Sequence, residues 1–356
     1  MTTMKFSAIV TAALLAGAMA TPAFAADNLP TGDASITFKK AINMTDAAGA
    51  GGVLGTISFT VSGAQEGDLP DTPEEGAALG TDDQLASPTA TATFARDAQG
   101  NLPTESDVTV NFDMTKFSAP GIYYYRLTEQ DPAISGLTTA PVYLLKARVI
   151  NADESNPDGQ SFKIDYAVLA PLAGGDKVDF IENDYTTYGL TVTKKLAGDF
   201  ADYSDSFDFT LSFTDPDTEG HMASVTVRTG AAGSTLTGDG EVLTFENGRA
   251  SITETIKADE MIEVTGLPEG TTYTIEEKGT DAAKYTTMWT TPTGNVLDTK
   301  TLADRTMDAA DTAITVTNTR DSVTPTGLML DAAPYGVMLA LAAGSGAVFF
   351  RKRRQD

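Results

Sequence analysis

The chain has 356 residues, with 24 lysines and arginines against 49 aspartates and glutamates, and a formal net charge of −25 at pH 7. A surface this acidic repels nucleic-acid phosphates, so we expect no nucleic-acid partner. The absence of cysteine excludes disulfide frameworks, thiolate metal sites and cysteine nucleophiles. The only histidine, His221, lies in a polar loop that begins at Asp215 and has no nucleophile arranged around it, so we expect a surface residue.

The N-terminus has the three parts of a secretory signal peptide. Lys5 precedes an apolar stretch over residues 6–20, and Ala23-Phe24-Ala25 supplies small residues for cleavage. We expect cleavage after Ala25 or Ala26, which makes residues 1–25 the signal peptide and sends the protein out of the cell.

The body of the chain is predicted to be all-β. Short alternating runs rich in Thr, Val, Ile, Phe and Tyr recur between Gly, Pro, Asp and Asn clusters, and no long stretch has helical periodicity. The expected strands are residues 35–40, 55–61, 107–112, 122–129, 143–150, 162–168, 190–194, 206–213, 223–228, 250–256, 272–276 and 313–317. Strands at this spacing favour β-sandwiches over barrels with a ligand cavity.

Short motifs recur in the same order in the two halves of the chain. The matching pairs are residues 36–40 with 190–194, residues 125–129 with 273–277, and residues 181–183 with 316–318. In each half a lysine comes first, a glutamate second and an asparagine last. This predicts two domains of one architecture, residues 26–185 and 186–320, that differ in loop length.

Residues 321–356 have the layout of a C-terminal sorting signal. Val323-Thr324-Pro325-Thr326-Gly327 precedes a largely apolar run, residues 328–350, and a basic cluster, residues 351–354. The run is long enough for a transmembrane helix, with the basic cluster on the cytoplasmic side. An ordinary membrane anchor is the alternative, although Asp331 within the run and the preceding Pro-Thr-Gly favour sorting.

This layout resembles the signal read by sortases of Gram-positive bacteria, which cut between the Thr and Gly of an LPxTG-type motif. The new carboxyl end is then passed to an amine. Pro325 directly before Thr326 departs from the commonest form and is closer to the xVPTG-type signals of some pilin subunits. The resemblance implies cleavage between Thr326 and Gly327 and covalent attachment to cell-wall peptidoglycan.

Strand periodicity aims three polar side chains per domain at the predicted core. Positions i, i+2 and i+4 of a strand share a face, so each lysine, glutamate and asparagine of the repeated motifs continues an apolar row. The inward-facing residues are Lys40, Glu129 and Asn183 in the first domain and Lys194, Glu277 and Asn318 in the second. A single such residue at a strand end is usually solvated. Because the same ordered set occurs twice, we instead expect all six side chains to be buried. Burying such groups unpaired is costly, so we also expect the three of each domain to contact one another.

This order resembles the isopeptide-forming Ig-like (CnaB-type) domains of Gram-positive pilins, and the junction from Asn183 to Lys195 resembles that of streptococcal T-antigen-like pilins. The resemblance implies two Lys–Asn amide bonds. They would join Lys40 to Asn183 with Glu129 assisting, and Lys194 to Asn318 with Glu277 assisting. Lys39, Lys195 and Glu276 are the register alternatives.

The implied chemistry follows from burial. Desolvation favours the neutral forms of lysine and glutamate, so a free amine can attack the asparagine carbonyl while a protonated glutamate polarises that carbonyl and shuttles a proton. The reaction occurs once per domain and is intramolecular, so the protein is not expected to be an enzyme. No metal or cofactor site is expected, because the acidic loops at residues 71–83 and 151–158 lack the spacing of an EF-hand.

In a sortase-built pilus the Thr carboxyl of one subunit is joined to a lysine of the next. The resemblance points to Lys177, just before the last strand of the first domain, with Lys146 and Lys163 as rivals; the YPKN pilin motif is absent. The expected protein is an extracellular, wall-linked shaft subunit whose partners are a sortase, further copies of itself, minor pilins and peptidoglycan. The alternatives are a non-polymerised adhesin or basal pilin that binds a host surface ligand, and an anchored hydrolase, for which no nucleophile motif is present.

Overall fold

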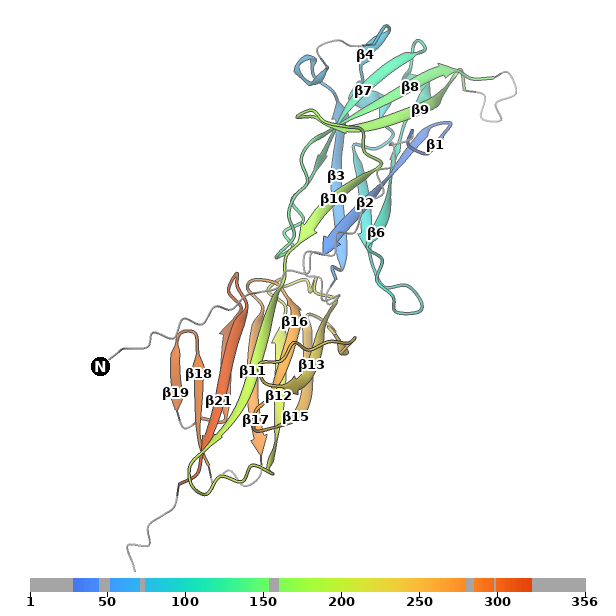
Figure 1. The fold of residues 1–356 in the computed structure, drawn as a ribbon. Coiled ribbons are helices and arrows are strands. Elements are labelled where there is room, and N and C mark those ends of the chain that lie inside the picture. The colour runs from blue at the N-terminus through green and yellow to red at the C-terminus, as the bar shows by residue number, and fades with distance from the viewer. Residues whose placement is uncertain are drawn as a thin grey trace, which may run out of the picture.

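A computed structural model describes residues 28–44, 52–70, 74–153, 160–279, 285–297 and 299–321. The predicted signal peptide and the sorting signal, including Pro325, Thr326 and Gly327, lie outside the described residues. Figure 1 shows two β-rich lobes arranged end to end. Among the described residues, no helix is both long and apolar enough to cross a membrane.

The first lobe contains two sheets packed face to face. Three strands of the smaller sheet lie in the order β1-β2-β10, and β6 pairs with β2; their bounds are β1 Thr31–Gly32, β2 Ser35–Met44, β6 Glu105–Asn111 and β10 Phe180–Tyr185. The larger sheet has the order β5-β3-β7-β8-β9, and β4 pairs with β7; the bounds are β3 Gly55–Gly63, β4 Ala77–Leu79, β5 Thr89–Phe94, β7 Gly121–Glu129, β8 Tyr143–Asn151 and β9 Phe162–Pro171. Three short 3-10 helices lie in the connections between strands of this lobe: η1 Glu66–Asp68, η2 Asp82–Gln84 and η3 Met114–Lys116.

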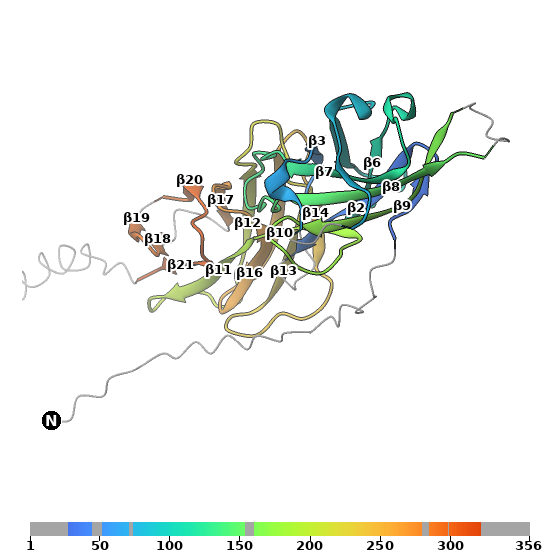
Figure 2. The same ribbon diagram turned by 90° about the horizontal axis from the view of Figure 1, so that it is seen from above.

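The second lobe repeats this arrangement with different edge strands. One sheet has the order β14-β13-β16-β11-β21-β18-β19, and its strands are β11 Tyr188–Ala197, β13 Ser224–Ala231, β14 Glu241–Thr244, β16 Glu260–Leu267, β18 Thr286–Thr291, β19 Gly294–Leu297 and β21 Thr312–Thr319. The other has the order β15-β12-β17-β20, with β12 Ser206–Thr214, β15 Arg249–Lys257, β17 Thr272–Gly279 and β20 Thr301–Thr306. Figure 2 shows the β18–β19 hairpin extending the sheet beyond β21.

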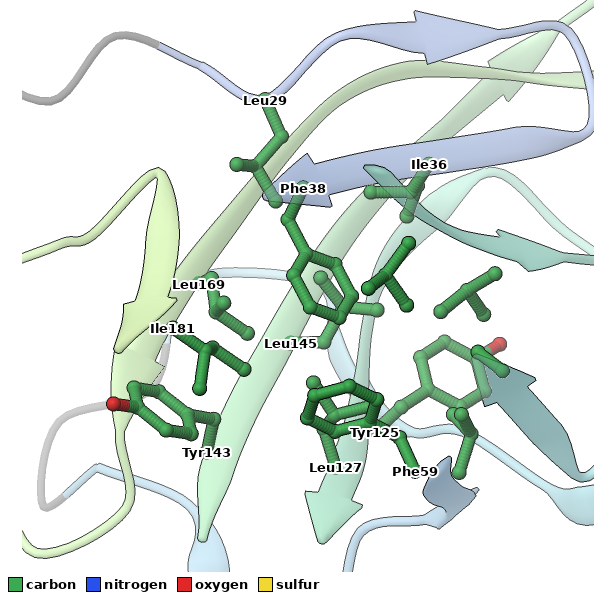
Figure 3. Close-up of a cluster of buried hydrophobic side chains, with 14 of the residues drawn as sticks. Leu29, Ile36, Phe38, Phe59, Tyr125, Leu127, Tyr143, Leu145, Leu169 and Ile181 are labelled. Atoms are coloured by element: carbon green, nitrogen blue, oxygen red, sulfur yellow. The ribbon is translucent and has the colours of Figure 1, made fainter. Parts of the chain in front are cut away.

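Each lobe has its own hydrophobic core between its two sheets. In the first lobe, Phe38 from β2 points between the sheets toward Phe59 and Leu127 (Figure 3), and the rings of Phe38 and Phe59 meet edge to face with centroids 5.6 Å apart. In the second, Trp289 and Phe209 pack edge to face at 6.4 Å. The expected all-β architecture of tandem Ig-like sandwiches is confirmed. Because β10 ends at Tyr185 and β11 begins at Tyr188, we propose the domain boundary between them.

The first long strand and the last strand of each lobe are parallel neighbours. β2 pairs with β10, so that Lys40 lies beside Ile181, and β11 pairs with β21, so that Lys194 lies beside Val316. Most other pairs are antiparallel, as is usual for a sandwich. This parallel pair brings the entry and exit strands of each lobe into contact over their whole shared length.

Backbone pairing joins the two lobes at their junction. Leu54 N donates to His221 O at 2.8 Å, and Ala223 N donates to Gly52 O at 3.0 Å. Asp217, in the loop between β12 and β13, accepts from both the backbone N (2.9 Å) and the hydroxyl (2.7 Å) of Ser135 in the first lobe. The His221 side chain is only 15% exposed and its Nδ1 lies 3.4 Å from Asp217. His221 is therefore partly buried rather than fully solvated as expected, because the first lobe covers part of the polar loop around it.

Replacing Asp217 by alanine is expected to loosen this junction. The change removes two hydrogen bonds to Ser135 from a partly buried carboxylate, which costs on the order of 1–3 kcal/mol. Small-angle X-ray scattering should then show a broader range of maximum dimensions for the variant. Asp239→Ala, at an exposed position of the same lobe, should leave the scattering unchanged. Identical curves for both variants would show that Asp217 does not hold the lobes together.

Candidate functional site: two buried Lys–Glu–Asn triads

The same three residue types meet in the core of each lobe, contributed by corresponding strands. The lysine and asparagine come from the parallel first and last strands of one sheet, and the glutamate comes from the facing sheet. In both lobes the asparagine lies two residues beyond the Cα partner of the lysine, which puts the two side chains on the same inner face. On the facing sheet, the backbone partner of Glu129 is Phe59 of β3. The corresponding partner of Glu277 is Phe209 of β12. The two sites are therefore equivalent in strand and register.

In the first lobe, Glu129 lies between the lysine and the asparagine. Lys40 Nζ is 3.3 Å from Glu129 Oε2, and Asn183 Nδ2 donates to Glu129 Oε1 at 2.5 Å. Lys40 Nζ also donates to Ile181 O at 3.4 Å. All three triad side chains are buried, and Asn183 Oδ1 has no hydrogen-bond partner among the described residues.

The second lobe holds a closely similar set. Lys194 Nζ lies 2.7 Å from Glu277 Oε1, to which Asn318 Nδ2 donates at 2.8 Å. Thr287 Oγ1 donates to Glu277 Oε2 at 3.5 Å, a contact that no feature of the sequence had indicated. As in the first lobe, the asparagine Oδ1 of this buried site has no hydrogen-bond partner within the described part of the chain. The electrophilic amide of each triad is thus held beside an amine and a carboxyl.

Burial lowers the pKa of both lysines. Desolvation reduces the pKa of Lys40 and of Lys194 to about 8, although the neighbouring Glu129 and Glu277 each act in the opposite direction. Apolar surroundings cause the desolvation: Lys194 Nζ lies 4.3 Å from the ring centroid of Phe207. Lowering the pKa increases the fraction of free amine, which is the nucleophilic form of lysine.

The orientation of the asparagine amides refines the expected role of the glutamates. In both triads the amide nitrogen, rather than its oxygen, faces the glutamate. The carboxyl is therefore placed for proton transfer to the nitrogen that would leave as ammonia. The expected polarisation of the carbonyl by the glutamate requires the amide turned over, because Oδ1 does not contact the carboxyl in this arrangement.

The residues of the alternative register face solvent. Lys39 lies 3.3 Å from Asp107 and 3.4 Å from Glu105, and Lys195 lies 2.5 Å from Asp259. Glu276 forms an ion pair with Lys278 at 3.4 Å on the outer face of β17. Period two explains the difference, since adjacent residues of a strand point to opposite faces. In the neighbouring pairs 39/40, 194/195 and 276/277, the residues that enter the core are thus Lys40, Lys194 and Glu277.

Among the three candidate linking lysines, Lys177 is the accessible one. It is exposed and forms no hydrogen bond or ion pair with any described residue. Lys146 forms an ion pair with Glu74 at 2.5 Å, and Lys163 forms one with Asp153 at 2.8 Å.

Known proteins resemble this chain both in its second lobe and over most of its length. Residues 188–320 match a family described as "Domain of unknown function (DUF7601)". A protein named Pilin from Streptococcus pyogenes serotype M1 is 30% identical over 290 residues, which span 76% of this chain and 78% of the relative.

Solved structures show the same fold. The crystal structure of the major pilin from Streptococcus pyogenes aligns with a TM-score of 0.59 and 23% identity, covering 82% of this chain and all of that one. The major pilin T-13 from the same species aligns with a TM-score of 0.54 and 20% identity, over 83% of this chain and all of that one. The class is thus a tandem Ig-like β-sandwich protein with a polar triad in each core. Given the extent and identity of the match to the Streptococcus relative, the chain belongs to the pilin family.

Proposed function

We propose that this pilin is the shaft subunit of a sortase-assembled pilus, displayed outside the cell, covalently linked to peptidoglycan and locked by two internal Lys–Asn isopeptide bonds. The observation that carries the proposal is the pair of buried triads in equivalent positions. Two isolated buried ion pairs would be a poor source of stability, because desolvation offsets much of their attraction. A covalent product explains why both are present.

The proposed reaction needs only the residues of the triad. The neutral lysine Nζ attacks the asparagine side-chain carbonyl carbon and forms the new C–N bond, and the C–N bond to the amide nitrogen breaks. The glutamate gives its proton to the departing nitrogen and receives one from the attacking amine, so it ends unchanged. Each bond releases one ammonia, and the chain undergoes the reaction once per lobe rather than acting as an enzyme with turnover.

Both bonds would connect the strands through which tension enters and leaves a lobe. Lys40 and Lys194 lie on the first long strand of each lobe, and Asn183 and Asn318 lie on the last. Force along the fibre would pass through the side-chain amide between parallel neighbours rather than unzip the sheets. This provides the extracellular stability that a chain without cysteine cannot obtain from disulfides.

Polymer growth would use a second kind of amide bond. We propose that a sortase cuts between Thr326 and Gly327 and joins the Thr326 carboxyl to Lys177 of another copy. At the end of the fibre where Thr326 is not joined to another copy, a minor pilin or peptidoglycan would take the same carboxyl.

A ladder of high-mass species that resist SDS in cell-wall extracts tests this function. The proposal predicts regularly spaced bands that all react with antibody against this chain, and a branched peptide that ends at Thr326 and is attached to a lysine. Wall-linked monomers without a ladder would instead identify an unpolymerised adhesin or basal pilin.

The rate of isopeptide formation is expected to fall above pH 8. The reactive form, a neutral amine beside a protonated carboxyl, holds the same number of protons as the Lys⁺/Glu⁻ ion pair. Above the pKa of Lys40 and Lys194, which is about 8, the lysine is neutral and the pair has lost the proton that the departing nitrogen needs. We therefore expect a constant rate from neutral pH to about 8 and a decrease of about tenfold per pH unit above it.

To measure the rate, newly synthesised chain is transferred to buffers between about pH 7 and pH 10. Mass spectrometry then follows the loss of about 17 Da per bond over time. A rate that rises above pH 8 would show that only the free amine limits the reaction and that the carboxyl proton is not needed.

A further inference from the structure

Large apolar side chains are exposed at only a few described positions, and most of these lie beside the proposed linkage points. The exposed fractions are 40% for Phe180, 57% for Phe200, 60% for Tyr203 and 61% for Val242. Phe200 and Tyr203 lie where the chain leaves the second lobe, and Phe180 lies three residues after Lys177. Val242 is on the edge strand β14, away from both points.

The loop that carries Phe200 and Tyr203 is fixed against the end of β21. Phe200 N donates to Arg320 O at 3.0 Å, and Arg320 N donates to Ala197 O at 3.0 Å. Gly198 has a φ of +92°, and a Cβ there would lie 2.3 Å from Arg320 O, so a larger residue would push the loop away. Tyr203 OH donates to Leu196 O at 3.4 Å. The backbone at Phe200 and the hydroxyl of Tyr203 are thus held in place before any partner binds, which reduces the entropic cost of ordering this loop on binding.

The short connection to Thr326 brings the next subunit close to this loop. Four residues lie between Asp321, the last described residue, and Thr326, so the five steps of chain span at most about 17 Å when fully extended. The β11–β12 loop and the end of β21 both lie at the end of the second lobe farthest from the first (Figure 1). The acceptor of the Thr326 carboxyl is therefore confined to the end of the second lobe that carries Phe200 and Tyr203.

The acceptor side presents a matching apolar residue. Lys177 lies in the exposed segment before β10, and Phe180 is the first residue of that strand. Phe180 faces outward because the alternation of β10 turns Ile181, Asn183 and Tyr185 into the core. Phe180 thus presents an exposed aromatic side chain on the outer face of the lobe, three residues after the exposed Lys177.

We propose that Phe200 and Tyr203 of one subunit pack against Phe180 and the segment 177–180 of the next copy of this chain. The inference rests on the proposed linkage of Thr326 to Lys177 and adds a non-covalent surface that orients the two subunits. The contact is heterologous, because different patches meet on the two copies, and contacts of this kind propagate as open filaments. It would hold Lys177 near the sorting end and fix the rotation between neighbouring subunits in the fibre.

Engineered cysteines test this contact cleanly, because the chain contains no cysteine of its own. Pili are prepared from the bacterium that makes this protein, carrying Phe200→Cys together with Phe180→Cys in the full-length chain, and are treated with a short bismaleimide. Phe180 begins β10 in the first lobe, whereas Phe200 lies in the β11–β12 loop at the far end of the second lobe (Figure 1), so a short cross-link between the two positions must join two copies. The expected result is a cross-linked peptide pair that contains positions 180 and 200.

The matched control pairs Val242→Cys with Phe180→Cys and should yield no such peptide pair. A second measurement uses Phe200→Ser with Tyr203→Ser, which should shift the SDS-resistant ladder to shorter species, whereas Val242→Ser should not. A normal ladder with no 180–200 cross-link, or a ladder unchanged by the double serine variant, would overturn the docking surface and leave the proposed function intact. Absence of any ladder from the wild-type chain would instead overturn the proposed function and this inference with it.

Discussion

Replacing Glu277 by glutamine is expected to lower the thermal unfolding midpoint of the second lobe by about 15 °C. An amide between Lys194 and Asn318 closes a loop of more than a hundred residues, which in the loop-entropy treatment of cross-links stabilises the lobe by about 5 kcal/mol. For a domain of this size each kcal/mol corresponds to about 3 °C. The variant also leaves the buried Lys194 without its carboxylate partner, which lowers stability further. Differential scanning calorimetry gives the midpoints.

Glu276→Gln is the matched control, because Glu276 is the neighbouring residue of the same strand but faces solvent. We expect its midpoint to remain within about 2 °C of wild type, as for most surface substitutions. Equal midpoints for Glu277→Gln and Glu276→Gln would contradict the cross-link in this lobe, since removal of the buried carboxylate would then have no covalent consequence.

Replacing Lys177 by alanine is expected to abolish the SDS-resistant ladder and leave single subunits attached to the wall. The polymer bond requires an accessible amine, and Lys177 is exposed and unpaired among the described residues. The subunit should remain folded, since an exposed loop lysine contributes little to stability. Immunoblots of wall extracts from the native bacterium measure the ladder.

The Lys177→Arg variant tests whether the ladder requires the lysine amine itself or only a positive charge at this position. Arginine keeps the positive charge but stays protonated at physiological pH and offers no free amine, so this variant should lose the ladder as completely as alanine does. Lys146→Ala should retain the ladder. Loss of the ladder in Lys146→Ala with a normal ladder in Lys177→Ala would reassign the link to Lys146.

The sequence predicted the strands best where large β-formers alternate with polar residues. β2, β7 and β12 were placed within a few residues, because their inward positions carry Phe, Tyr, Leu or Ile. β5 was missed although its burial alternates perfectly, since Ala90 and Ala92 provide two of its three buried side chains and alanine is a weak strand signal. β16 was missed because it is buried at consecutive positions near both ends, which hides the period of two.

The candidate site was predictable because strand periodicity decides between adjacent residues. Counting by two from Ile36 or Leu190 leads to Lys40 and Lys194, and the structure places both lysines in the core and their neighbours Lys39 and Lys195 outside. What the sequence could not provide was the contact of Glu277 with Thr287 or the side of each asparagine amide that faces the acid. Those features depend on how two facing sheets pack, and no local pattern encodes them.

The partial burial of His221 was beyond sequence reasoning for a related reason. Its loop is polar and would be solvated on an isolated lobe, yet residues 52–54 and Ser135 of the first lobe cover it. Contacts between lobes leave no periodic trace in a single chain, whereas contacts within a sheet do.

The most direct test of the account is the intact mass of the mature chain beside its Glu129→Ala and Glu277→Ala variants. Each Lys–Asn amide expels one ammonia, so the wild-type protein should be lighter than its sequence by about 34 Da and each variant by about 17 Da after correction for the substitution. Fragmentation should place the bonds between Lys40 and Asn183 and between Lys194 and Asn318. A wild-type mass equal to that of the unmodified sequence would contradict both cross-links.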